Sequence, residues 1–453
     1  MSVTQEIRTE EIRTGGGELA RARRGSVGHV YRVERRKLAS QLAVRLVALV
    51  CLLSPFVFGG ILRVQSGSPT DTLYGVWVHS SGFAVSLLLL AFAGSWGFPL
   101  VAGIVAGDMF SSEDRYGTWK LVLTRSCSRG EVFAGKLLAS AEFTIGLLVL
   151  TAASSIVAGV LLVGDQALVS LSGTVLSAGH SLGLVLASWL LCLFPALAFA
   201  SLGVLLSIAT RNGIFGVIGP GLAALAMQLL LLVGSGIYAH MLLVGSAFGT
   251  WHALFSAHAF YGQVLVGILV SVVWTVVCLT VSWRILRKRD FAGTPVSRRQ
   301  GWATPVRVAL SLVAVIALVA IAGNWGPAGV TGARLLANFI PTFNNLTLLQ
   351  QRELGRAVAP DARLSIQFPT CSRRAGTPTG PGEWVCTFSV LGVQTSPLPP
   401  PQTTVTYELS VQQDGCYKAQ SPPAFVGQQM MRDAGGHSVV NPLFTIYGCL
   451  NTI

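Results

Sequence analysis

Residues 107–136, which read GDMFSSEDRYGTWKLVLTRSCSRGEVFAGK, separate two long apolar runs of the chain. Nine of these side chains are ionisable, namely Asp108, Glu113, Asp114, Arg115, Lys120, Arg125, Arg129, Glu131 and Lys136. One charge at the centre of a bilayer costs roughly 2.5–3.5 kcal/mol, so nine would cost about 20–30 kcal/mol on the same scale. We therefore expect the segment 108–136 to lie outside the hydrocarbon core, in water or against a soluble protein.

The composition of the chain indicates a membrane protein. Of its 453 residues, 52% are hydrophobic and 11% are charged, and the mean hydropathy is +0.62, whereas soluble domains contain about 25% charged residues. The net charge of +13 would suit a nucleic-acid partner. However, the basic residues cluster where apolar runs end, which is the pattern that sets membrane topology. We therefore expect membrane lipid, and no nucleic acid, as a partner.

Seven apolar runs are long enough to cross a bilayer, which takes about 20 residues. They cover residues 41–62, 83–106, 137–163, 182–208, 214–236, 264–284 and 306–323. We predict an all-α polytopic membrane protein in which six spans form a core and a seventh follows. Trp96 and Pro99 indicate a kink in the second span.

Lysine and arginine lie almost entirely on one side of this arrangement. If the N-terminus is cytosolic, the inside segments hold 23 basic residues and the short outside loops hold only Arg63. Cytoplasmic segments carry the excess of these residues. We therefore expect a multi-pass protein of the plasma membrane with a disordered cytosolic tail over 1–24. A basic linker and the seventh span over 291–323 would then lead to an extracytoplasmic domain over 324–453.

Four cysteines fall in this outer segment, namely Cys371, Cys386, Cys416 and Cys449. An even set in an oxidising compartment indicates two disulfides. Three pairings are possible, and we favour Cys371–Cys386 with Cys416–Cys449. Their loops of about 15 and about 33 residues would each stabilise the domain by about 3–4 kcal/mol in the chain-entropy model. A zinc site is the alternative, but the close Cys-x-x-Cys spacing is missing.

Alternating patterns in the same segment predict one helix on a small antiparallel sheet. The helix is expected over 344–358 and the strands over 363–368, 383–390, 403–411 and 416–419, with proline-rich turns between them. The fold class of the outer segment is therefore a small α+β domain that contains disulfides.

The charged segment 108–136 has helical signals of its own. Tyr116, Trp119 and Leu123 are spaced to share one helix face. Ser128 and Glu131 form the Ser-x-x-Glu pattern of a capping box just before the third apolar run. We predict a helix, a turn, and a second helix that continues into the third span.

These residues also carry a family resemblance. The series Glu113, Gly117-Thr118, Leu123, Arg129 and Gly135-Lys136 resembles the first cytosolic loop of type-2 ABC exporter permeases. The likeness extends over 25–290, including the six spans and residues 33–38, which resemble the amphipathic connecting helix of that family at the cytosolic surface. Ser126 stands where the family often has proline. Residues 291–453 have no counterpart in the family core and resemble an addition found in some actinobacterial exporters.

The resemblance implies a permease core over 25–290 that has no ATPase of its own. It would form a homodimer, or a pseudo-dimer with a related permease, and would dock a separate ABC ATPase subunit through the coupling loop 108–136. ATP and magnesium would belong to that partner, and this chain would hold no cofactor. The residues implied at or beside the contact are Glu113, Arg115, Gly117, Thr118, Lys120, Arg129 and Lys136. A solvated loop that serves topology alone is the alternative.

Residues 130–136 match the first part of a phosphate-binding loop, but Leu137 replaces the Ser or Thr that would hold magnesium. We therefore expect no ATP site in this chain, which would not itself be an enzyme.

Other polar features lie within or beside the spans. Trp96, Glu142 and Gln228 are candidates for a transport pathway or for contacts inside the bundle. Glu142 could instead reach the cytosolic surface, and Gln228 could join two helices. His180, His240, His252 and His258 fall on the outer side, where interfacial hydrogen bonds are commoner than a metal site, and we predict no metal. The stretch 234–263 resembles the short re-entrant helices of the family, with an interfacial aromatic belt as the alternative.

Two functions follow as hypotheses. In the first, the chain is the membrane subunit of an ATP-driven exporter of lipophilic or amphipathic molecules, such as a drug, an antibiotic or a lipid-like compound. In the second, it is a membrane-anchored sensor or assembly protein whose outer domain binds a partner.

Overall fold

The computed structural model describes residues 26–65, 69, 71–124, 128–232, 240–256, 259–289, 329–359, 362–391 and 402–451. Within them, six helical segments are long and apolar enough to cross a membrane: Leu42–Val64, Gly82–Ala106, Arg129–Leu162, Ala178–Thr210, Gly213–Leu230 and Tyr261–Lys288. Each overlaps one of the first six predicted spans. The tail 1–24 and the predicted seventh span 306–323 lie outside the described residues.

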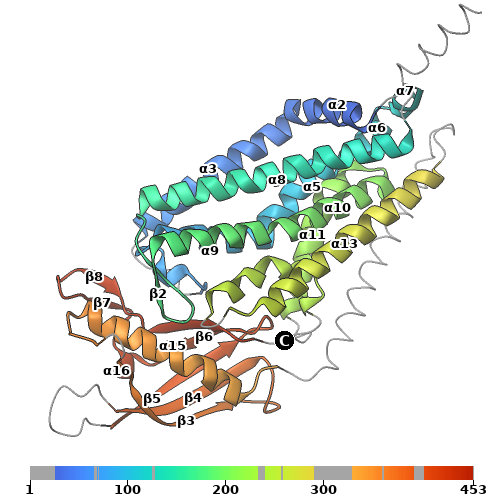
Figure 1. Cartoon of the computed structure of the whole chain (residues 1–453). Helices are drawn as coiled ribbons and strands as arrows, with labels where there is room; N and C mark the ends of the chain where they lie inside the picture. The colour runs from blue at the N-terminus through green and yellow to red at the C-terminus, as the bar shows by residue number, and fades with distance from the viewer. Residues whose placement is uncertain are drawn as a thin grey trace, which may run out of the picture.

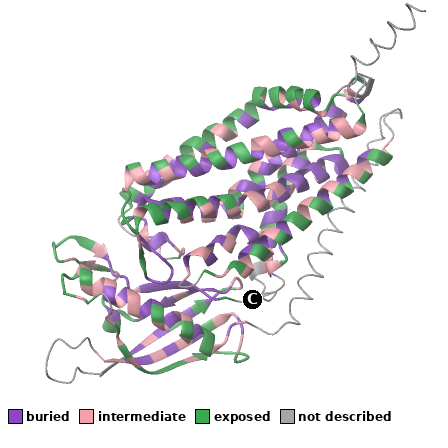
Figure 2. Cartoon of the chain, viewed as in Figure 1, coloured by how far each residue is buried: buried purple, intermediate pink, exposed green. Residues whose placement is uncertain are grey.

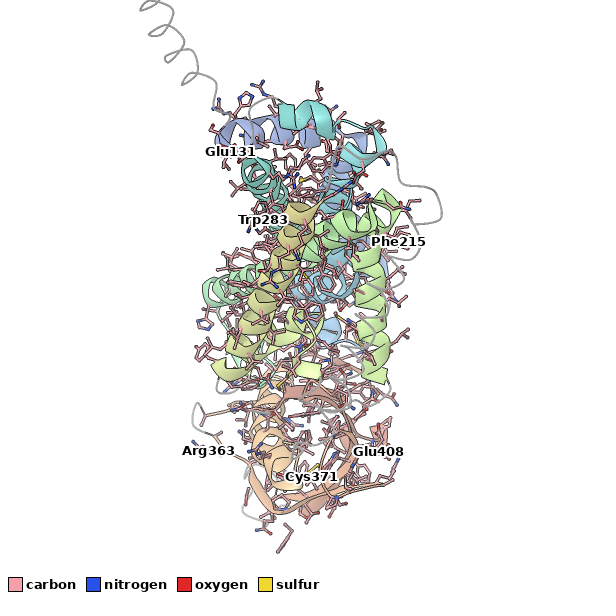
Figure 3. The ribbon with its side chains drawn as sticks, turned by 90° about the vertical axis from the view of Figure 1, so that its right-hand side faces the viewer. Glu131, Phe215, Trp283, Arg363, Cys371 and Glu408 are labelled. Atoms are coloured by element: carbon pink, nitrogen blue, oxygen red, sulfur yellow. A yellow bond between two sulfur atoms is a disulfide. The ribbon has the colours of Figure 1, made fainter. Side chains whose placement is uncertain are left out.

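The spans form a bundle with a different structure at each end. The helices are α2 (Val27–Ser40), α3 (Leu42–Val64), α4 (Gly82–Phe92), α5 (Phe98–Ala106), α6 (Ser111–Arg115), α7 (Trp119–Thr124), α8 (Arg129–Leu162), α9 (Ala178–Leu191), α10 (Leu193–Thr210), α11 (Gly213–Leu232) and α13 (Tyr261–Lys288). We call the end that bears α2, α6 and α7 the loop end (Figure 1). The opposite end, the domain end, carries the β-sheet domain. Figure 3 shows the same order after a quarter turn, with Glu131 at the loop end and Cys371 at the domain end.

Burial in the bundle is uneven, as expected for helices that face lipid on one side. In the most apolar stretch of the fourth span, Ala178–Thr210, 72% of the residues are buried, whereas in that of the first span only 22% are buried. Figure 2 shows exposed residues along the outer sides of α3 and α13. Small residues bring neighbouring helices close together: a Cβ on Gly159 of α8 would lie 2.2 Å from the carbonyl oxygen of Gly82 on α4. Such close backbone approach is typical of membrane helix packing.

A π-helical turn, η2 (Ala93–Gly97), interrupts the second span between α4 and α5. It lies at the place where Trp96 and Pro99 predict a kink. Pro99 follows this turn directly within the continuous helical run, and it has no N–H to donate to the preceding turn. π turns are among the recognised causes of a bend in a helix.

The domain at the other end consists of α15 (Gly332–Glu353) against a five-stranded antiparallel sheet in the order β3-β4-β5-β6-β9. The strands are β3 (Ser365–Arg373), β4 (Gly382–Leu391), β5 (Gln402–Val411), β6 (Cys416–Gln420) and β9 (Thr445–Cys449), and β7 (Met430–Arg432) pairs with β8 (Ser438–Val440) beside the sheet. The predicted strands correspond to β3 to β6. Aromatic side chains of α15 and the sheet, including Phe339, Phe343 and Phe388, form the core.

The helix of this domain differs from the prediction, which placed it over 344–358. It begins twelve residues earlier, where the Thr331 hydroxyl caps it by accepting a hydrogen bond from the Arg334 N–H at 3.3 Å, and it contains Pro341. Proline disfavours a helix interior, so the pattern before it did not indicate a helix. The helix ends at Glu353, and Gly355 follows with a φ of +74°.

Two disulfides close the sheet, in the pairing that the sequence favoured. Cys371–Cys386 joins β3 to β4, and Cys416–Cys449 joins β6 to β9, in each case between directly opposed residues. The fold class is therefore a helical multi-span region followed by a small β-sheet domain that holds two disulfides.

Polar contacts join the domain to several parts of the bundle, and three of them involve different segments. The Lys418 ammonium lies 2.8 Å from an Asp71 carboxylate oxygen, just after the first span. The Asn345 side chain donates to the Ser172 carbonyl at 2.9 Å, which belongs to the hairpin β1 (Leu168–Val169) and β2 (Val175–Leu176) after the third span. The Gln263 side chain of α13 donates to the Leu450 carbonyl at 3.3 Å.

Candidate functional site

The charged segment at the loop end folds as two short helices and a cap. α6 ends in a turn at Gly117, whose φ is +65°, and the Thr118 N–H donates to the Glu113 carbonyl at 3.0 Å. This turn separates Tyr116 from Trp119, so the predicted single helix face with Leu123 is wrong: Tyr116 is exposed and Trp119 is buried. A glycine in the left-handed region favours such a break.

The capping box before the third span is confirmed. The Ser128 hydroxyl accepts a hydrogen bond from the Glu131 N–H at 3.2 Å, and a Glu131 carboxylate oxygen accepts one from the Ser128 N–H at 2.7 Å. Two otherwise unsatisfied N–H groups at the start of α8 are thereby satisfied.

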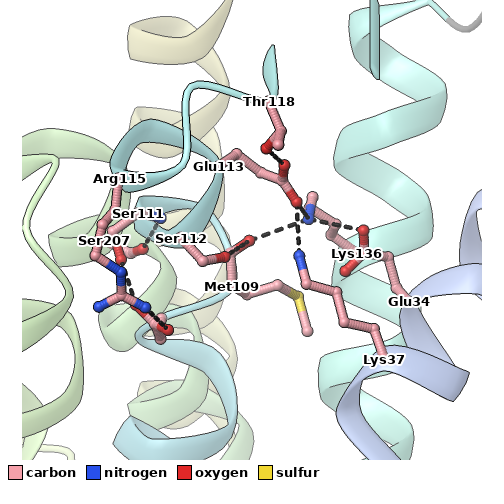
Figure 4. A network of polar contacts seen from close by, with 11 residues as sticks. Glu34, Lys37, Met109, Ser111, Ser112, Glu113, Arg115, Thr118, Lys136 and Ser207 are labelled. Atoms are coloured by element: carbon pink, nitrogen blue, oxygen red, sulfur yellow. Dashed lines mark hydrogen bonds and ion pairs between the residues drawn. The ribbon is translucent and has the colours of Figure 1, made fainter. Parts of the chain in front are cut away.

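A cluster of four charged side chains and one hydroxyl joins the segment 108–136 to α2 and α8. We call this cluster the charged joint, and it consists of Glu34, Lys37, Glu113, Thr118 and Lys136. Lys136 of α8 is 0% exposed. Its Nζ donates to Glu34 Oε1 at 2.8 Å, to Glu113 Oε1 at 3.1 Å and to the Met109 carbonyl at 3.0 Å. Lys37 Nζ donates to Glu113 Oε1 at 2.7 Å, and the Thr118 hydroxyl donates to Glu113 Oε2. Figure 4 shows these groups converging from α2, α6 and α8.

The joint keeps Glu113 ionised. Burial alone would raise the pKa of this carboxyl group, but the charge of Lys136 and the hydrogen bonds from Lys37 and Thr118 lower it to about 2. The pKa of Lys37 is raised, because its contacts with Glu113 and Glu34 outweigh the opposing effect of burial. Two carboxylates therefore face two ammonium groups in a cluster whose formal charges balance, which is the condition under which buried charges are tolerated.

A second set of contacts ties the segment to the ends of other spans. Arg289, just after α13, donates from Nη1 to Asp114 Oδ2 at 2.9 Å. Arg129 donates to the Arg287 carbonyl at 2.7 Å and to the Arg289 carbonyl at 2.9 Å. The Ser111 N–H donates to Ser207 Oγ of α10 at 3.0 Å. The segment is thus fixed to α2, α8, α10 and α13.

Most of the predicted docking residues belong to this assembly. Glu113, Thr118 and Lys136 lie in the joint, Gly117 forms its turn, and Arg129 holds the end of α13. Arg115 is exposed and pairs with Asp108 at 2.9 Å, and Lys120 lies in α7. Sequence reasoning missed Glu34, Lys37, Asp114 and Arg289 as contact residues. The Glu-Arg-Arg-Lys run at 34–37 was the available signal, although a charged run gives no partner by itself.

The predicted pathway residues lie in different places. Glu142 accepts a hydrogen bond from the Tyr31 hydroxyl at 2.6 Å and lies 3.3 Å from Arg35, so it serves the contact between α2 and α8 near the loop end. Trp96 is exposed on the outside of the bundle. Gln228 lines a cavity of about 230 Å³ at the domain end, together with His240 and His252.

One group of metal-ligand type occurs in the part of the chain that the structure describes. The ligand atoms of His252, Cys416 and Cys449 all lie within 4.8 Å of one another. The two cysteines form a disulfide, so in this oxidised form the group offers a metal one imidazole nitrogen. His258 lies outside the described residues, and His180 is exposed on α9.

The chain matches a known protein family over most of the bundle. Residues 47–292, more than half of the chain, match a family described as "Protein of unknown function (DUF2705)". No curated protein matches the chain. The matched region begins within α3 and ends just after α13, so it contains the charged segment and stops before the β-sheet domain.

Proposed function

We propose that this chain, which belongs to the DUF2705 family, is the membrane subunit of an ATP-driven exporter and docks a separate ATPase at its loop end. The charged joint is the observation that carries the proposal. It connects α6 rigidly to α2 and α8, and Asp114 and Arg129 connect the same segment to the end of α13. A partner that pushed on α6 and α7 would therefore move several spans together.

The proposal assigns the loop end to the cytosol and the domain end to the outside. The excess of lysine and arginine around the segment 108–136 and after α13 supports this orientation. The two disulfides of the opposite domain also support it, because disulfides persist in oxidising compartments.

The docking surface is the outer side of α6 and α7. Tyr116 is 71% exposed and Leu121 is 58% exposed, although both belong to a charged segment that cannot enter the hydrocarbon core. An exposed aromatic and an exposed leucine beside charged residues have the composition of a protein interface, which has an apolar centre and a polar rim. Two copies, or this chain and a related permease, would each bind one ATPase, and the cargo would be lipophilic or amphipathic.

Leu121→Arg should weaken docking strongly without disturbing the joint. The full chain, purified from its native membranes in mild detergent, should retain vanadate-sensitive ATP hydrolysis. The variant should retain about thirtyfold less, because a central interface residue contributes about 2 kcal/mol or more. Glu113→Lys and Thr118→Trp should have the same effect through the joint. Phe368→Arg is the matched control, since Phe368 is 77% exposed at the opposite end. Equal hydrolysis in all variants would show that docking occurs elsewhere.

The orientation has its own test, in a Cys127→Ser background that removes the native cysteine of the segment 107–136. In intact cells, a membrane-impermeant maleimide should label Phe368→Cys, and it should label Tyr116→Cys only after permeabilisation. Both positions are exposed, but Tyr116 directly follows α6 at the loop end, whereas Phe368 lies in β3 of the domain (Figure 1). Labelling of Tyr116→Cys from outside would reverse the orientation and remove the basis for docking at the loop end.

The alternative function is that of a membrane-anchored sensor or assembly protein. The observation in its favour is that the disulfide-bonded domain closes cavities at its junction with the bundle. This function predicts that the purified chain retains no ATP hydrolysis while its outer domain still binds a partner.

A further inference from the structure

Two adjacent cavities lie where the β-sheet domain meets the bundle. The larger, of about 230 Å³, is lined by residues of the second span, α11, α13, the short helix η3 (Ser246–Phe255) and the turn between β5 and β6. The smaller, of about 180 Å³, extends toward Tyr74 and Tyr417. Trp251, His252 and Cys416 line both. Together the two volumes reach the lower end of the range of ~300–1,000 Å³ that is typical of small-molecule sites.

Three buried polar atoms at these cavities have no hydrogen-bond partner among the described residues. They are Tyr74 Oη, Trp251 Nε1 and His252 Nε2. The rings of Tyr74 and Trp251 stack at 6.1 Å, and the rings of Trp251 and His252 meet edge to face at 4.0 Å. Leaving one such group unsatisfied costs roughly 1–3 kcal/mol, and buried polar groups in native proteins are rarely left so. A hydrogen-bond donor in the cavity could satisfy two of the three, because Tyr74 Oη and an unprotonated His252 Nε2 accept, whereas Trp251 Nε1 only donates.

The charge of the larger cavity restricts that occupant. Its described lining contains no lysine or arginine, and Asp414 is the carboxylate in it. Burial lowers the pKa of His240, and it lowers that of His252 to about 4, so both imidazoles are neutral at pH 7. The smaller cavity adds Asp71 and Lys418, whose charges pair at 2.8 Å. Asp414 therefore leaves the combined lining with a net negative charge, which favours a cation over an anion. Met241, Phe248 and Val266 supply an apolar side.

The Asp414 carboxylate that lines the cavity belongs to the β-sheet domain. The turn that carries Asp414 is closed by hydrogen bonds from the Gln412 N–H to the Cys416 carbonyl at 2.8 Å and from the Gly415 N–H to the Gln412 carbonyl at 3.1 Å. Asp414 Oδ1 accepts from the Cys416 N–H at 2.9 Å. The bridge from Cys416 to Cys449 then fixes this turn to β9. The turn is a rigid cover over the cavity.

We propose that this junction binds a small amphipathic molecule whose head carries one positive charge. Asp414 and the ring of Trp251 face the head, since an indole face attracts a cation, and Phe248 with Met241 contacts the apolar part. The site deepens the proposed export function by naming its substrate class and by placing a binding site on the outer half of the route. It rests on that function only for the direction from which the ligand arrives.

Phenylbutylammonium and phenylbutyrate are suitable probes, because they share a ring and a chain and differ in charge. With the purified full chain in detergent, and without any ATPase, calorimetry should detect binding of the cation, and the anion should bind at least about tenfold more weakly. Asp414→Asn should weaken cation binding about tenfold, and it keeps the oxygen that accepts from the Cys416 N–H. Trp251→Phe should also weaken it while retaining a ring.

Asp433→Asn is the matched control, because Asp433 belongs to the same domain but bonds to His437 beside β8, away from the cavities. Equal binding of both probes, or cation binding that is unchanged in Asp414→Asn, would overturn the proposal. Cation binding that persists in a preparation without ATP hydrolysis would uphold the site and refute only the ATPase partnership.

Discussion

Lys136→Met should destabilise the chain by about 3–5 kcal/mol, because it leaves Glu34 and Glu113 buried without the cation that they share. Methionine has a similar length and lacks the charge, so the packing around Phe110 is largely kept. The measurement is thermal unfolding of the detergent-purified chain, with the helix content as the monitored signal.

Lys37→Met is the matched control for this prediction. Lys37 contacts the same carboxylate, but its side chain is partly exposed, so its loss should cost no more than about 1 kcal/mol. Replacing Glu34 and Glu113 by glutamine in the Lys136→Met background should restore much of the stability, since no buried charge then remains unpaired. If Lys136→Met and Lys37→Met destabilise the chain equally, the joint does not depend on the buried lysine.

The same interaction predicts a dependence on pH. The pKa of Glu113 is lowered from its ordinary value of 4.5 to about 2 in the folded chain. The stability that this carboxylate contributes is therefore present above about pH 4.5 and is lost as the pH falls toward about 2. The difference in unfolding temperature between the wild type and Lys136→Met should shrink over that interval, because a protonated Glu113 no longer requires the cation.

The sequence predicted the features that depend on local patterns. Hydropathy located the six spans that the structure describes, the Ser128–Glu131 spacing predicted the cap of α8, and the cysteines predicted the two bridges. The spans and the cap are each encoded within a short stretch of chain, and the two bridges follow from an even number of cysteines in one segment. The turn at Gly117 was missed because a helical spacing of apolar residues does not register one residue that ends the helix.

The rest depends on residues that are distant in sequence. Glu34 and Lys136 are separated by 102 positions, and Asp114 and Arg289 by 175, so no local pattern pairs them. The larger cavity at the junction is still harder to predict from sequence, because its walls come from four helical segments and a β turn. β7 and β8 were missed because they are only three residues long, too short for a clear alternation. β9 was missed because all five of its residues are buried, so exposed and buried positions do not alternate along it.

The second span relates the two proposed sites. At one end of this span, α5 leads into α6 and the charged joint. Near its middle, Ser95 in the π turn and Ala91 just before it line the larger cavity. In the proposed exporter, a push on α6 would therefore reach the cavity wall through one helix. The π turn interrupts the regular hydrogen-bond pattern of that helix, so we expect the helix to bend there.

Removing either disulfide should destabilise the domain, but only one should change ligand binding. In the chain-entropy model, the loop of 33 residues closed by Cys416–Cys449 contributes about 4 kcal/mol, and the loop of 15 closed by Cys371–Cys386 about 3 kcal/mol. Paired alanine substitutions should lower the unfolding temperature of the domain in that order. Differential scanning calorimetry of the two variants measures this difference.

The binding measurement separates a role in the site from a role in stability. Cys416 lines both cavities and anchors the turn that carries Asp414, whereas Cys371 and Cys386 lie at the other edge of the sheet. At a temperature where both variants are folded, loss of the Cys416–Cys449 bridge should weaken phenylbutylammonium binding, because an unfixed turn has to be ordered by the ligand. The Cys371–Cys386 variant should bind as the wild type does. Equal weakening in both would mean that the disulfides support the whole domain and that the cover over the cavity needs no anchor of its own.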